Sequence, residues 1–361
     1  MIRGVLIGAG GFGAAWVNFF LPQFRDRIEI VAISDIDPHV LKRAGEVLSV
    51  PEVCLFANYT EMLATVAAEV CFIVIRPEFR TEAVRAVAER GLAVLCEKPM
   101  AASWQQTLDI GNIVTESGIK YAVMQNYREQ SRIHALKHVL QRNDLKPINL
   151  IECRFGINFS IDNAGGAFRH QIPDAFIYEG SEHHFDQLRN LTGADAEWVS
   201  GVQWGQEWST FGSPTCCSLH IRMTNGVMVS YEMNNVERGT QNGWHEEFYR
   251  ISTAGGTVTL DNDHIIRIVR DTETGRTIEE IVPETLDREE HIVIISSFLD
   301  WIDGGDPPFS IFEDNVRTMA LTFAAVESTH TGTRINARDM LETAFPAIAD
   351  ATGQEPHASY P

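Results

Sequence analysis

A glycine-rich turn near the start of the chain restricts the possible folds more than any other feature. It follows an apolar run over residues 2–7 and precedes a stretch of helical character over residues 14–20. The turn consists of Gly8, Ala9, Gly10, Gly11, Phe12 and Gly13. In a strand-turn-helix unit, Gly8 permits the tight turn, Gly10 lets the backbone approach a pyrophosphate, and Gly13 lets the helix pack closely on the strand. The pattern therefore predicts that this turn binds a dinucleotide.

An aspartate at the end of the second predicted strand supports this interpretation. The strand covers residues 28–34, and Asp35 stands 35 − 13 = 22 residues after Gly13. An acid near this spacing accepts hydrogen bonds from the ribose hydroxyls of adenosine and repels a 2′-phosphate. Ile36 supplies no positive charge to offset that repulsion, so NAD is predicted in preference to NADP. The alternative is that Asp35 merely begins a turn.

Two further predicted strands lead to polar residues in the same domain. Apolar runs over residues 70–75 and 93–96 are typical of strands buried on both faces of a parallel sheet. Ligands of such sheets bind beyond the carboxyl ends of the strands. The residues predicted to contact the cofactor there are Ile75, Arg76, Pro77, Glu97 and Lys98. Lys98 is also predicted to be catalytic; the alternative is a solvated charge pair of Glu97 and Lys98 in a loop.

A second polar cluster lies on a helix predicted over residues 175–191. Glu179, His183 and Asp186 are spaced i, i+4 and i+7, which places them on one helix face. A neighbouring carboxylate can orient an imidazole, so His183 is predicted to be a general base with Glu179 as its partner. One alternative is a solvated polar face. Another is a metal site, but Lys98 in the same pocket would compete with the cation, so no metal is predicted.

These motifs resemble those of the Gfo/Idh/MocA family, the relatives of glucose-fructose oxidoreductase and inositol dehydrogenase. The resemblance rests on the glycine turn, Asp35, the turn at Pro77, the motif Glu97-Lys98-Pro99 and residues 179–186. It implies that Lys98 contacts both the nicotinamide ribose and the substrate. It also implies that His183 exchanges the hydroxyl proton of the substrate.

The family resemblance further implies that the second domain has a largely antiparallel sheet, whose open face often forms the oligomer interface. The chain differs from many family members at two places. Glu179 stands where many members carry Asp, which keeps the charge and adds one methylene. Residues 77–81 read Pro-Glu-Phe-Arg-Thr, where a Pro-Asn turn often ends in His.

The predicted fold class is α/β, with an N-terminal Rossmann domain and a C-terminal α+β domain. Residues 1–126 alternate between strand and helix patterns, which predicts a doubly wound parallel sheet. Residues 127–350 contain strand patterns joined by Asn-Gly and Gly-Gly turns, which predicts an antiparallel meander. The family resemblance implies that this domain, with a largely antiparallel open sheet, serves substrate binding and oligomerisation. Residues 351–361 are predicted to be a loosely held tail.

Substrate contacts are predicted around an irregular stretch over residues 160–173, which is rich in Gly, Asn and Asp. It precedes the helix of His183 and is either a substrate loop or an ordinary surface loop. The residues predicted to bind the substrate are Lys98, Asn126, Arg128, Arg169, His170, Glu179 and His183.

Charge and cysteine content restrict the class of partner. A formal net charge of -20 disfavours nucleic acid and anionic lipid surfaces, so a small molecule is the expected partner. The family resemblance implies further copies of the chain as partners, in a dimer or tetramer. The six cysteines form no Cys-x-x-Cys pair, which favours reduced thiols. With no secretory leader or membrane span in the sequence, a cytoplasmic location is predicted.

Together these features predict an NAD-dependent oxidoreductase. It would oxidise a secondary hydroxyl of a sugar, cyclitol or related polyol, with His183 as the proton acceptor and Lys98 as the group that stabilises the alkoxide. One alternative is a non-catalytic sensor that binds a dinucleotide. Another is a redox-assisted glycosidase that holds NAD tightly and produces no net NADH.

Overall fold

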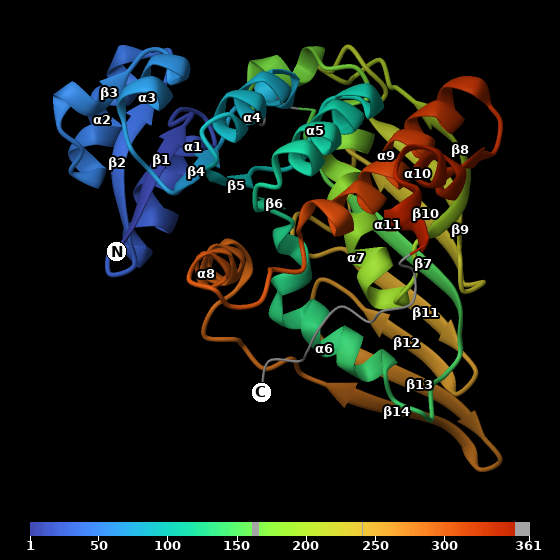
Figure 1. The fold of residues 1–361 in the computed structure, drawn as a ribbon. Coiled ribbons are helices and arrows are strands. Elements are labelled where there is room, and N and C mark those ends of the chain that lie inside the picture. The colour runs from blue at the N-terminus through green and yellow to red at the C-terminus, as the bar shows by residue number, and fades with distance from the viewer. Residues whose placement is uncertain (161–165, 240, 351–361) are drawn as a thin grey trace. The chain divides into compact units, whose positions relative to one another are not determined.

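The chain divides into two compact units (Figure 1). The computed structural model describes residues 1–160, 166–239 and 241–350. The first unit comprises Met1–Gln125 and His291–Val316, and the second comprises Asn126–Glu290 and the segment that begins at Arg317. Each unit has its own sheet and its own buried core.

A six-stranded parallel sheet forms the centre of the first unit. In spatial order its strands are β3 (Leu55–Phe56), β2 (Ile28–Ser34), β1 (Ile2–Ile7), β4 (Val70–Ile73), β5 (Ala93–Cys96) and β6 (Tyr121–Val123). All neighbouring strands run parallel. The order reverses between β1 and β4, and cofactors bind beyond the carboxyl ends of strands at such a switch point. The predicted doubly wound sheet is confirmed.

Helices follow most of these strands, and polar side chains begin several of them. The helices of the first unit are α1 (Gly13–Ala15), α2 (Pro38–Leu48), α3 (Tyr59–Thr65), α4 (Arg80–Ala88), α5 (Trp104–Ser117) and α8 (Glu290–Ile302), whose first residue belongs to the second unit. A π-helical turn over Trp16–Phe20 continues α1. The Asp37 carboxylate accepts the His39 and Val40 amides at the start of α2, and Ser103 caps α5 in the same way.

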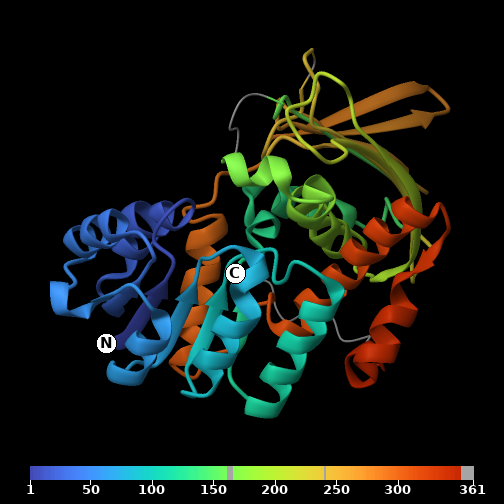
Figure 2. The same ribbon diagram turned by 90° about the horizontal axis from the view of Figure 1, so that it is seen from above.

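Helix α8 explains why the division differs from the predicted one, in which residues 127–350 form a continuous second domain. Ile294, Ile295, Phe298 and Leu299 of α8 are buried in the core that covers the parallel sheet. Figure 2 shows α8, in orange, running alongside this sheet. An apolar helix face completes the first core although it lies far along the chain. The predicted tail, residues 351–361, lies outside the described residues.

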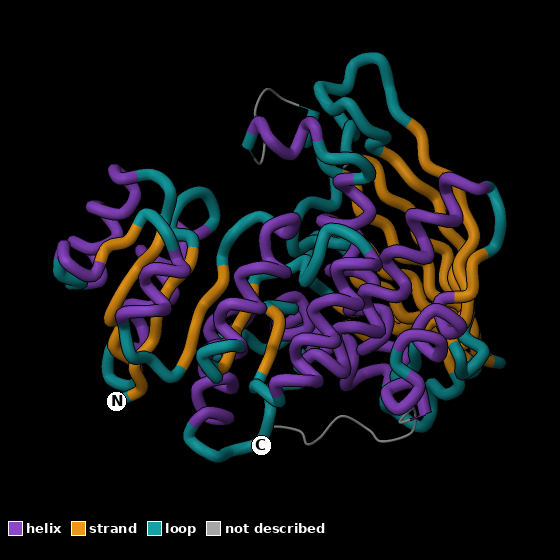
Figure 3. The backbone as a smooth tube through the Cα atoms, turned by 45° about the horizontal axis from the view of Figure 1, so that its top comes forward, coloured by secondary structure: helices purple, strands orange, loops and turns teal. Residues whose placement is uncertain are grey.

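A nine-stranded mixed sheet forms the second unit, and Figure 3 shows its strands in orange. In spatial order they are β14 (Gly275–Ile281), β13 (Ile266–Thr272), β12 (Gly256–Leu260), β11 (Phe248–Thr253), β7 (Ile148–Gly156), β10 (Met228–Asn234), β9 (Cys216–Met223), β8 (Ala196–Trp204) and β15 (Ile335–Asn336). Only β7 and β10 pair in parallel, and the other neighbours in this sheet are antiparallel. The prediction of a largely antiparallel sheet is confirmed.

Helices cover one face of this sheet. They are α6 (Ser131–Leu140), α7 (Glu182–Thr192), α10 (Ala337–Ala344), α11 (Pro346–Asp350) and the part of α9 (Phe312–Thr331) that begins at Arg317, since its earlier residues belong to the first unit. Along β9, buried and more exposed residues alternate, as expected for a strand with one face on the core. The predicted helix over residues 175–191 begins with a π-helical turn over Phe176–Ser181 before α7. Among the described residues, no helix combines the length and the apolar character needed to cross a membrane.

Candidate active site

The glycine turn of the first unit has the shape of a cofactor-binding loop. A Cβ atom on Gly8 would lie 2.4 Å from the carbonyl oxygen of Val74, and one on Gly13 would lie 2.5 Å from the carbonyl oxygen of Gly8. Any larger residue at these two positions would clash with backbone carbonyl oxygens, so both positions require glycine. By contrast, a Cβ on Gly11 would meet nothing within 4 Å, and one on Gly10 would make only ordinary contacts. The open side of the turn therefore has room for a phosphate group.

Asp35 lies directly against this turn. Its Oδ2 accepts hydrogen bonds from the amides of Ala9 at 2.8 Å and Gly10 at 3.0 Å. Its Oδ1 accepts the Asp37 amide at 3.0 Å, which leaves lone pairs that can accept ribose hydroxyls. Ile36 beside it is 92% exposed and brings no positive charge. The residues present therefore fit NAD.

The turn that contains Lys98 is joined to the glycine turn through Glu97. The Glu97 carboxylate is buried and accepts the indole N–H of Trp16 at 2.9 Å and the backbone amide of Lys98 at 3.0 Å. His291 Nε2 lies 3.6 Å from the same carboxylate. Trp16 follows the glycine turn by three residues, so one carboxylate connects the start of the first helical segment with the exit of β5. Lys98 itself is half-buried.

The protonation state of Glu97 follows from these contacts. Burial alone would raise the pKa of Glu97, but the hydrogen bonds from His291 and Trp16 and the charges of His291 and Lys98 outweigh it and hold the pKa below its ordinary value. The His291 ring also stacks on Phe20, with ring centres 4.3 Å apart. Glu97 is therefore a buried, ionised anchor for this part of the first unit.

The turn after β4 contains the other residues predicted to contact the cofactor. The strand ends at Ile73, two residues earlier than the predicted end at Ile75, and a 3-10 turn follows over Pro77–Phe79. Pro77 is buried, whereas Arg76 forms an exposed ion pair with Glu78 at 3.2 Å. Arg76 and Pro77 thus lie in the turn beyond the carboxyl end of β4. Lys98 follows β5 at the same edge of the sheet.

His183 is the centre of the candidate site of the second unit. It lies in the first turn of α7, is 4% exposed, and stacks on the ring of Tyr127 with centres 3.8 Å apart and planes inclined by 15°. The Trp244 ring lies 6.3 Å away at a steep angle. Burial and the negative charge of Glu290 raise the pKa of Tyr127 well above its ordinary value. Tyr127 therefore stays a neutral phenol beside the imidazole.

Arg128 and Asp186 form a buried bidentate ion pair behind this stack. Arg128 Nε and Nη2 each donate to a carboxylate oxygen of Asp186 at 2.6 Å. Thr318 Oγ1 also donates to Asp186, at 3.1 Å. Arg128, predicted to bind the substrate, and Asp186, predicted on the same face as His183, are therefore bound to each other. The pair holds the turn that contains Tyr127 against α7.

Two predicted substrate residues lie before α7. Arg169 Nε donates to Glu179 Oε2 at 2.7 Å, so the carboxylate predicted to partner His183 carries an ion pair of its own. His170 stacks on Phe211 with ring centres 3.9 Å apart, and its Nδ1 lies 3.2 Å from the carbonyl oxygen of Thr210. Residues 161–165 of the predicted substrate loop lie outside the described residues.

A further acid and imidazole lie beside Tyr127. Asn126 Nδ2 donates to Glu290 Oε2 at 2.9 Å, and the other carboxylate oxygen lies 2.6 Å from His245 Nδ1. The His245 ring centre is 4.7 Å from that of Tyr127. His245 and Glu290 both have left-handed backbone conformations, with φ of 67° and 52°. Backbone strain of this kind concentrates at functional sites, so the pair extends the candidate site.

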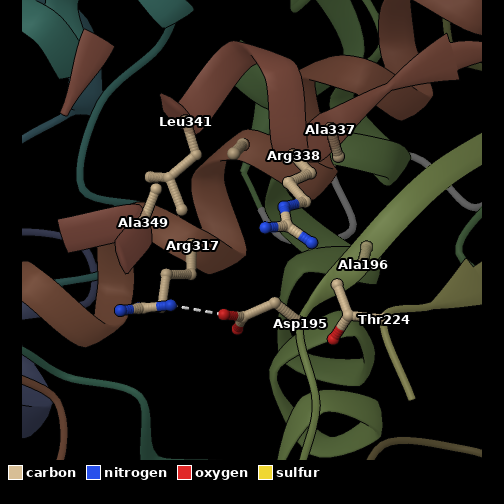
Figure 4. A pocket seen from close by; sticks show the side chains of 9 residues that line it. Asp195, Ala196, Thr224, Arg317, Ala337, Arg338, Leu341 and Ala349 are labelled. Atoms are coloured by element: carbon tan, nitrogen blue, oxygen red, sulfur yellow. Dashed lines mark hydrogen bonds and ion pairs between the residues drawn. The ribbon is translucent and has the colours of Figure 1, made fainter. Parts of the chain in front are cut away.

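A pocket lies near the C-terminal end of α7, and the ion pair in its lining joins α9 to the chain just after α7 (Figure 4). It is lined by Asp195, Ala196, Thr224, Arg317, Ala320, Ala337, Arg338, Leu341 and Ala349. Arg317 forms an ion pair with Asp195, and Arg189 Nε donates to the same carboxylate at 2.9 Å. Burial would raise the pKa of Asp195, but these two arginines outweigh it and lower the pKa. Asp195, Arg317 and Arg189 therefore hold α9 against the end of α7.

The arrangement of possible metal ligands and the state of the cysteines bear on metal and thiol chemistry. Within residues 1–160, 166–239 and 241–350, no group of three or more His, Cys, Asp or Glu side chains is arranged to hold a metal ion. The six cysteines all lie within the described residues and form no disulfide. Burial raises the pKa of Cys153 to about 12 and that of Cys71 well above its ordinary value, so these two remain protonated.

Several residues of these sites have no signal in the sequence pattern. They are Trp16, Tyr127, Trp244, His245, Glu290 and His291. Tyr127 lies between two predicted site residues, Asn126 and Arg128, which is the only local signal. The others become neighbours through the fold and stand apart from any motif.

Comparison with known proteins identifies relatives of this arrangement. Residues 2–125 match the family model GFO_IDH_MocA, described as "Oxidoreductase family, NAD-binding Rossmann fold". The chain is 27% identical over 347 residues to an uncharacterized protein, y4oX, of Sinorhizobium fredii, covering 93% of this chain and 96% of the relative. It is 22% identical over 366 residues to a D-apiose dehydrogenase of Paraburkholderia graminis, covering 97% and 93%.

A solved structure shares the fold over almost the whole length of both chains. It is an oxidoreductase from Agrobacterium radiobacter in complex with NAD+, L-tartaric acid and magnesium. The TM-score is 0.81 at 21% sequence identity, covering 94% of this chain and 99% of that one.

The buried Glu97 anchor generates a prediction about stability and pH. The pKa of Glu97 is lower in the folded protein than in the unfolded chain. Its contribution to the free energy of unfolding is therefore complete above the ordinary glutamate pKa of about 4.3 and is lost as the pH falls through the pKa of the folded state. Replacing Glu97 by Gln should lower the free energy of unfolding by about 3–5 kcal/mol at pH 7. Urea unfolding, followed by tryptophan fluorescence, should show this difference shrinking as the pH falls below about 4.

The exposed acid Glu78 is the matched control. Its surface ion pair with Arg76 should contribute about 0–1 kcal/mol, so Glu78→Gln should unfold almost like the wild type. A Glu97→Gln variant that is as stable as Glu78→Gln at pH 7 would contradict the anchoring role.

Proposed function

Because the chain belongs to the Gfo/Idh/MocA family of oxidoreductases, we propose that it oxidises a secondary hydroxyl of a sugar, cyclitol or related polyol, with NAD as the hydride acceptor. The oxidoreductase family model and the relative named as a D-apiose dehydrogenase support a dehydrogenase that acts on CH–OH groups. The observation that best supports the finer proposal is the shared Glu97 carboxylate. It ties the turn containing Lys98 to the segment that follows the glycine turn. The groups for alkoxide stabilisation and for cofactor binding are thereby part of one rigid arrangement.

The proposed chemistry assigns one task to each of two side chains. The neutral imidazole of His183 accepts the hydroxyl proton of the substrate. The Lys98 ammonium stabilises the negative charge that develops on the same oxygen. When bound, the nicotinamide ring accepts the hydride from the carbon atom, which leaves a carbonyl product. Tyr127 stacks on His183 and fixes the plane of the imidazole.

The polar groups around His183 support the proposed substrate class. Asn126, Glu290 and His245 offer a carboxylate, an amide and an imidazole within one connected group. Such groups suit the several hydroxyls of a sugar, and the half-buried Trp244 offers an apolar ring face. The D-apiose dehydrogenase relative acts, by its name, on a sugar. Arg128 is assigned to positioning through Asp186, and Arg169 and His170 remain proposed substrate contacts.

We also propose that the chain forms a homo-oligomer through the face of the nine-stranded sheet that the helices leave open. On β8 this face exposes Val202 and Trp204, at 58% and 40%. Exposed apolar side chains on a sheet face favour association with another protein surface.

The direct test is a panel of sugars, cyclitols and polyols, assayed by NADH absorbance. Lys98→Ala and His183→Ala should each lower kcat by about 10²–10⁴-fold on the true substrate, because positioned acid–base groups contribute this much. Both variants should still bind NAD. Lys42→Ala and His220→Ala, which alter exposed residues of the same types, serve as controls.

Other outcomes of the panel would favour different functions. Turnover of a glycoside without net NADH would indicate a redox-assisted glycosidase. NAD binding without turnover of any compound would favour a sensor. Near-normal turnover by both variants would refute the assigned chemistry.

The position of Asp35 generates a prediction of cofactor preference. The carboxylate repels a 2′-phosphate, so NAD should bind at least about tenfold more tightly than NADP, which corresponds to about 1.4 kcal/mol. Fluorescence titration of both cofactors measures the ratio. Asp35→Ala should narrow the gap, whereas Asp26→Ala, at an exposed acid, should not. Equal affinities in the wild type would contradict the proposal.

The ion pair between Arg169 and Glu179 generates a prediction about pH. His183 must be neutral to accept a proton, so kcat/KM should rise with pH along an acidic limb. Glu179→Gln removes a negative charge that favours imidazolium and should move the limb to lower pH. Arg169→Ala leaves that charge unneutralised and should move the limb to higher pH.

The double variant provides the control for this effect. In the absence of the Glu179 charge, replacing Arg169 should hardly move the acidic limb of kcat/KM any further. The pH profile of Arg169→Ala/Glu179→Gln should therefore resemble that of Glu179→Gln alone. Tyr127 does not contribute to the limb, because its pKa is raised far above the range in which imidazoles titrate. An acidic limb that persists in His183→Asn would remove His183 from the role of base.

A further inference from the structure

Arg80 is a buried cation that contacts the exits of two strands. It is the first residue of α4 and is 3% exposed. Its Nε donates to the carbonyl oxygen of Ile75, beyond β4, at 2.8 Å. Its Nη1 donates to the carbonyl oxygens of Glu97 and Pro99, and its Nη2 donates to that of Lys98 at 3.4 Å. Four backbone carbonyls from two strand exits thus converge on one guanidinium.

The location of this guanidinium is costly for a positive charge. Burial removes its hydration, and the N-terminal end of a helix disfavours cations. Its hydrogen-bond partners are neutral carbonyl oxygens rather than a carboxylate. Because the buried positive charge of Arg80 has these carbonyls rather than a carboxylate as partners, the planar set of N–H donors in its guanidinium group is the feature that this location uses. No other side chain offers such a planar fork of donors.

The backbone of Lys98 depends on this fork. The Lys98 amide donates to the carboxylate of Glu97 at 3.0 Å, and the Lys98 carbonyl accepts from Arg80. Strand β5 ends at Cys96, so side chains rather than a strand partner hold the peptide groups on both sides of Lys98. The carbonyl oxygens of Glu97 and Pro99, the residues before and after Lys98, accept hydrogen bonds from the same guanidinium group.

We propose that Arg80 is a positioning residue for Lys98, and the proposal rests on the catalytic role assigned to Lys98 above. The guanidinium gathers the three consecutive carbonyls of residues 97–99 and anchors them to the exit of β4 through Ile75. This fixes the direction in which the Lys98 side chain leaves the backbone. The required property is the fork rather than the charge, because a single ammonium cannot supply donors from three nitrogen atoms at fixed angles.

The first test compares Arg80→Lys with the wild type and with Arg85→Ala. Arg80→Lys keeps the charge and most of the volume, and Arg85 is an exposed arginine on the same helix. Arg80→Lys should lower kcat by about 10²-fold, since misplacement by about 1 Å can cost that much, with the affinity for NAD unchanged. Arg85→Ala should behave like the wild type. A wild-type kcat in Arg80→Lys would show that charge alone suffices and would overturn the proposal.

The second test restores the missing group chemically. In Arg80→Ala, guanidinium chloride at a non-denaturing concentration should restore part of kcat, whereas urea and potassium chloride at the same concentration should not. Rescue supports a local role for the planar fork. Equal effects of guanidinium and urea on kcat would overturn it, as would a loss of NAD affinity that parallels the loss of kcat.

The third test needs no turnover and therefore separates this proposal from the proposed function. Trace acetylation, read by mass spectrometry, gives the reactivity of Lys98 relative to exposed Lys42 in the same sample. In Arg80→Lys the ratio should shift towards one, because Lys98 loses its fixed position. An unchanged ratio overturns the role of Arg80 even if the wild type is an active dehydrogenase. A shifted ratio in a protein without turnover on any sugar or polyol would support Arg80 and refute the proposed function.

Discussion

The buried carboxylate of Glu97 is the constraint on which the first unit depends. A buried carboxylate is costly unless its oxygens are hydrogen-bonded, so the fold has to bring donors to it. The donors come from Trp16, from the Lys98 amide and from His291, which lie in three separate parts of the chain. Meeting this requirement brings together the segment after the glycine turn, the exit of β5 and the start of α8. It also gives a polar reason, besides the apolar face of α8, for residues after 290 to return to the first unit.

The second unit uses the same principle at Asp186. This carboxylate is fully buried and is satisfied by Arg128 and Thr318. Arg128 follows Tyr127 directly, and Asp186 lies less than one helical turn after His183. The ion pair therefore sets the contact between the phenol ring and the imidazole. In the first unit, the carboxylate binds the backbone amide of Lys98 directly, whereas in the second unit it binds Arg128, the residue after Tyr127.

The parts of this arrangement that the sequence predicts are those specified by local spacing. Gly8, Gly13 and Asp35 follow from a short strand-turn-helix pattern. The parallel sheet follows from apolar runs that alternate with helix patterns, and the antiparallel sheet from strand patterns joined by Asn-Gly and Gly-Gly turns. The contact between Glu97 and His291 joins residues 291 − 97 = 194 positions apart, and no periodicity extends over such a distance. The grouping of α8 with the first unit was missed for the same reason. The stacking of Tyr127 on His183 also depends on tertiary packing rather than on spacing.

Departures from regular helix explain the rest of the difference. A π-helical turn has i→i+5 hydrogen bonds, so it rotates the residues before it relative to those after it, and such turns are frequent at functional sites. Glu179 lies within the turn over Phe176–Ser181 and pairs with Arg169, whereas His183 and Asp186 lie in α7. The turn over Trp16–Phe20 similarly follows the glycine turn and supplies the rings that contact Glu97 and His291. A sequence pattern interpreted with 3.6 residues per turn places all of these side chains on the faces of regular α-helices. In the structure, a π-helical turn contains Trp16 and Phe20 in the first unit, and another precedes His183 in the second. The helix geometry, more than the choice of residues, is therefore what the sequence pattern fails to specify.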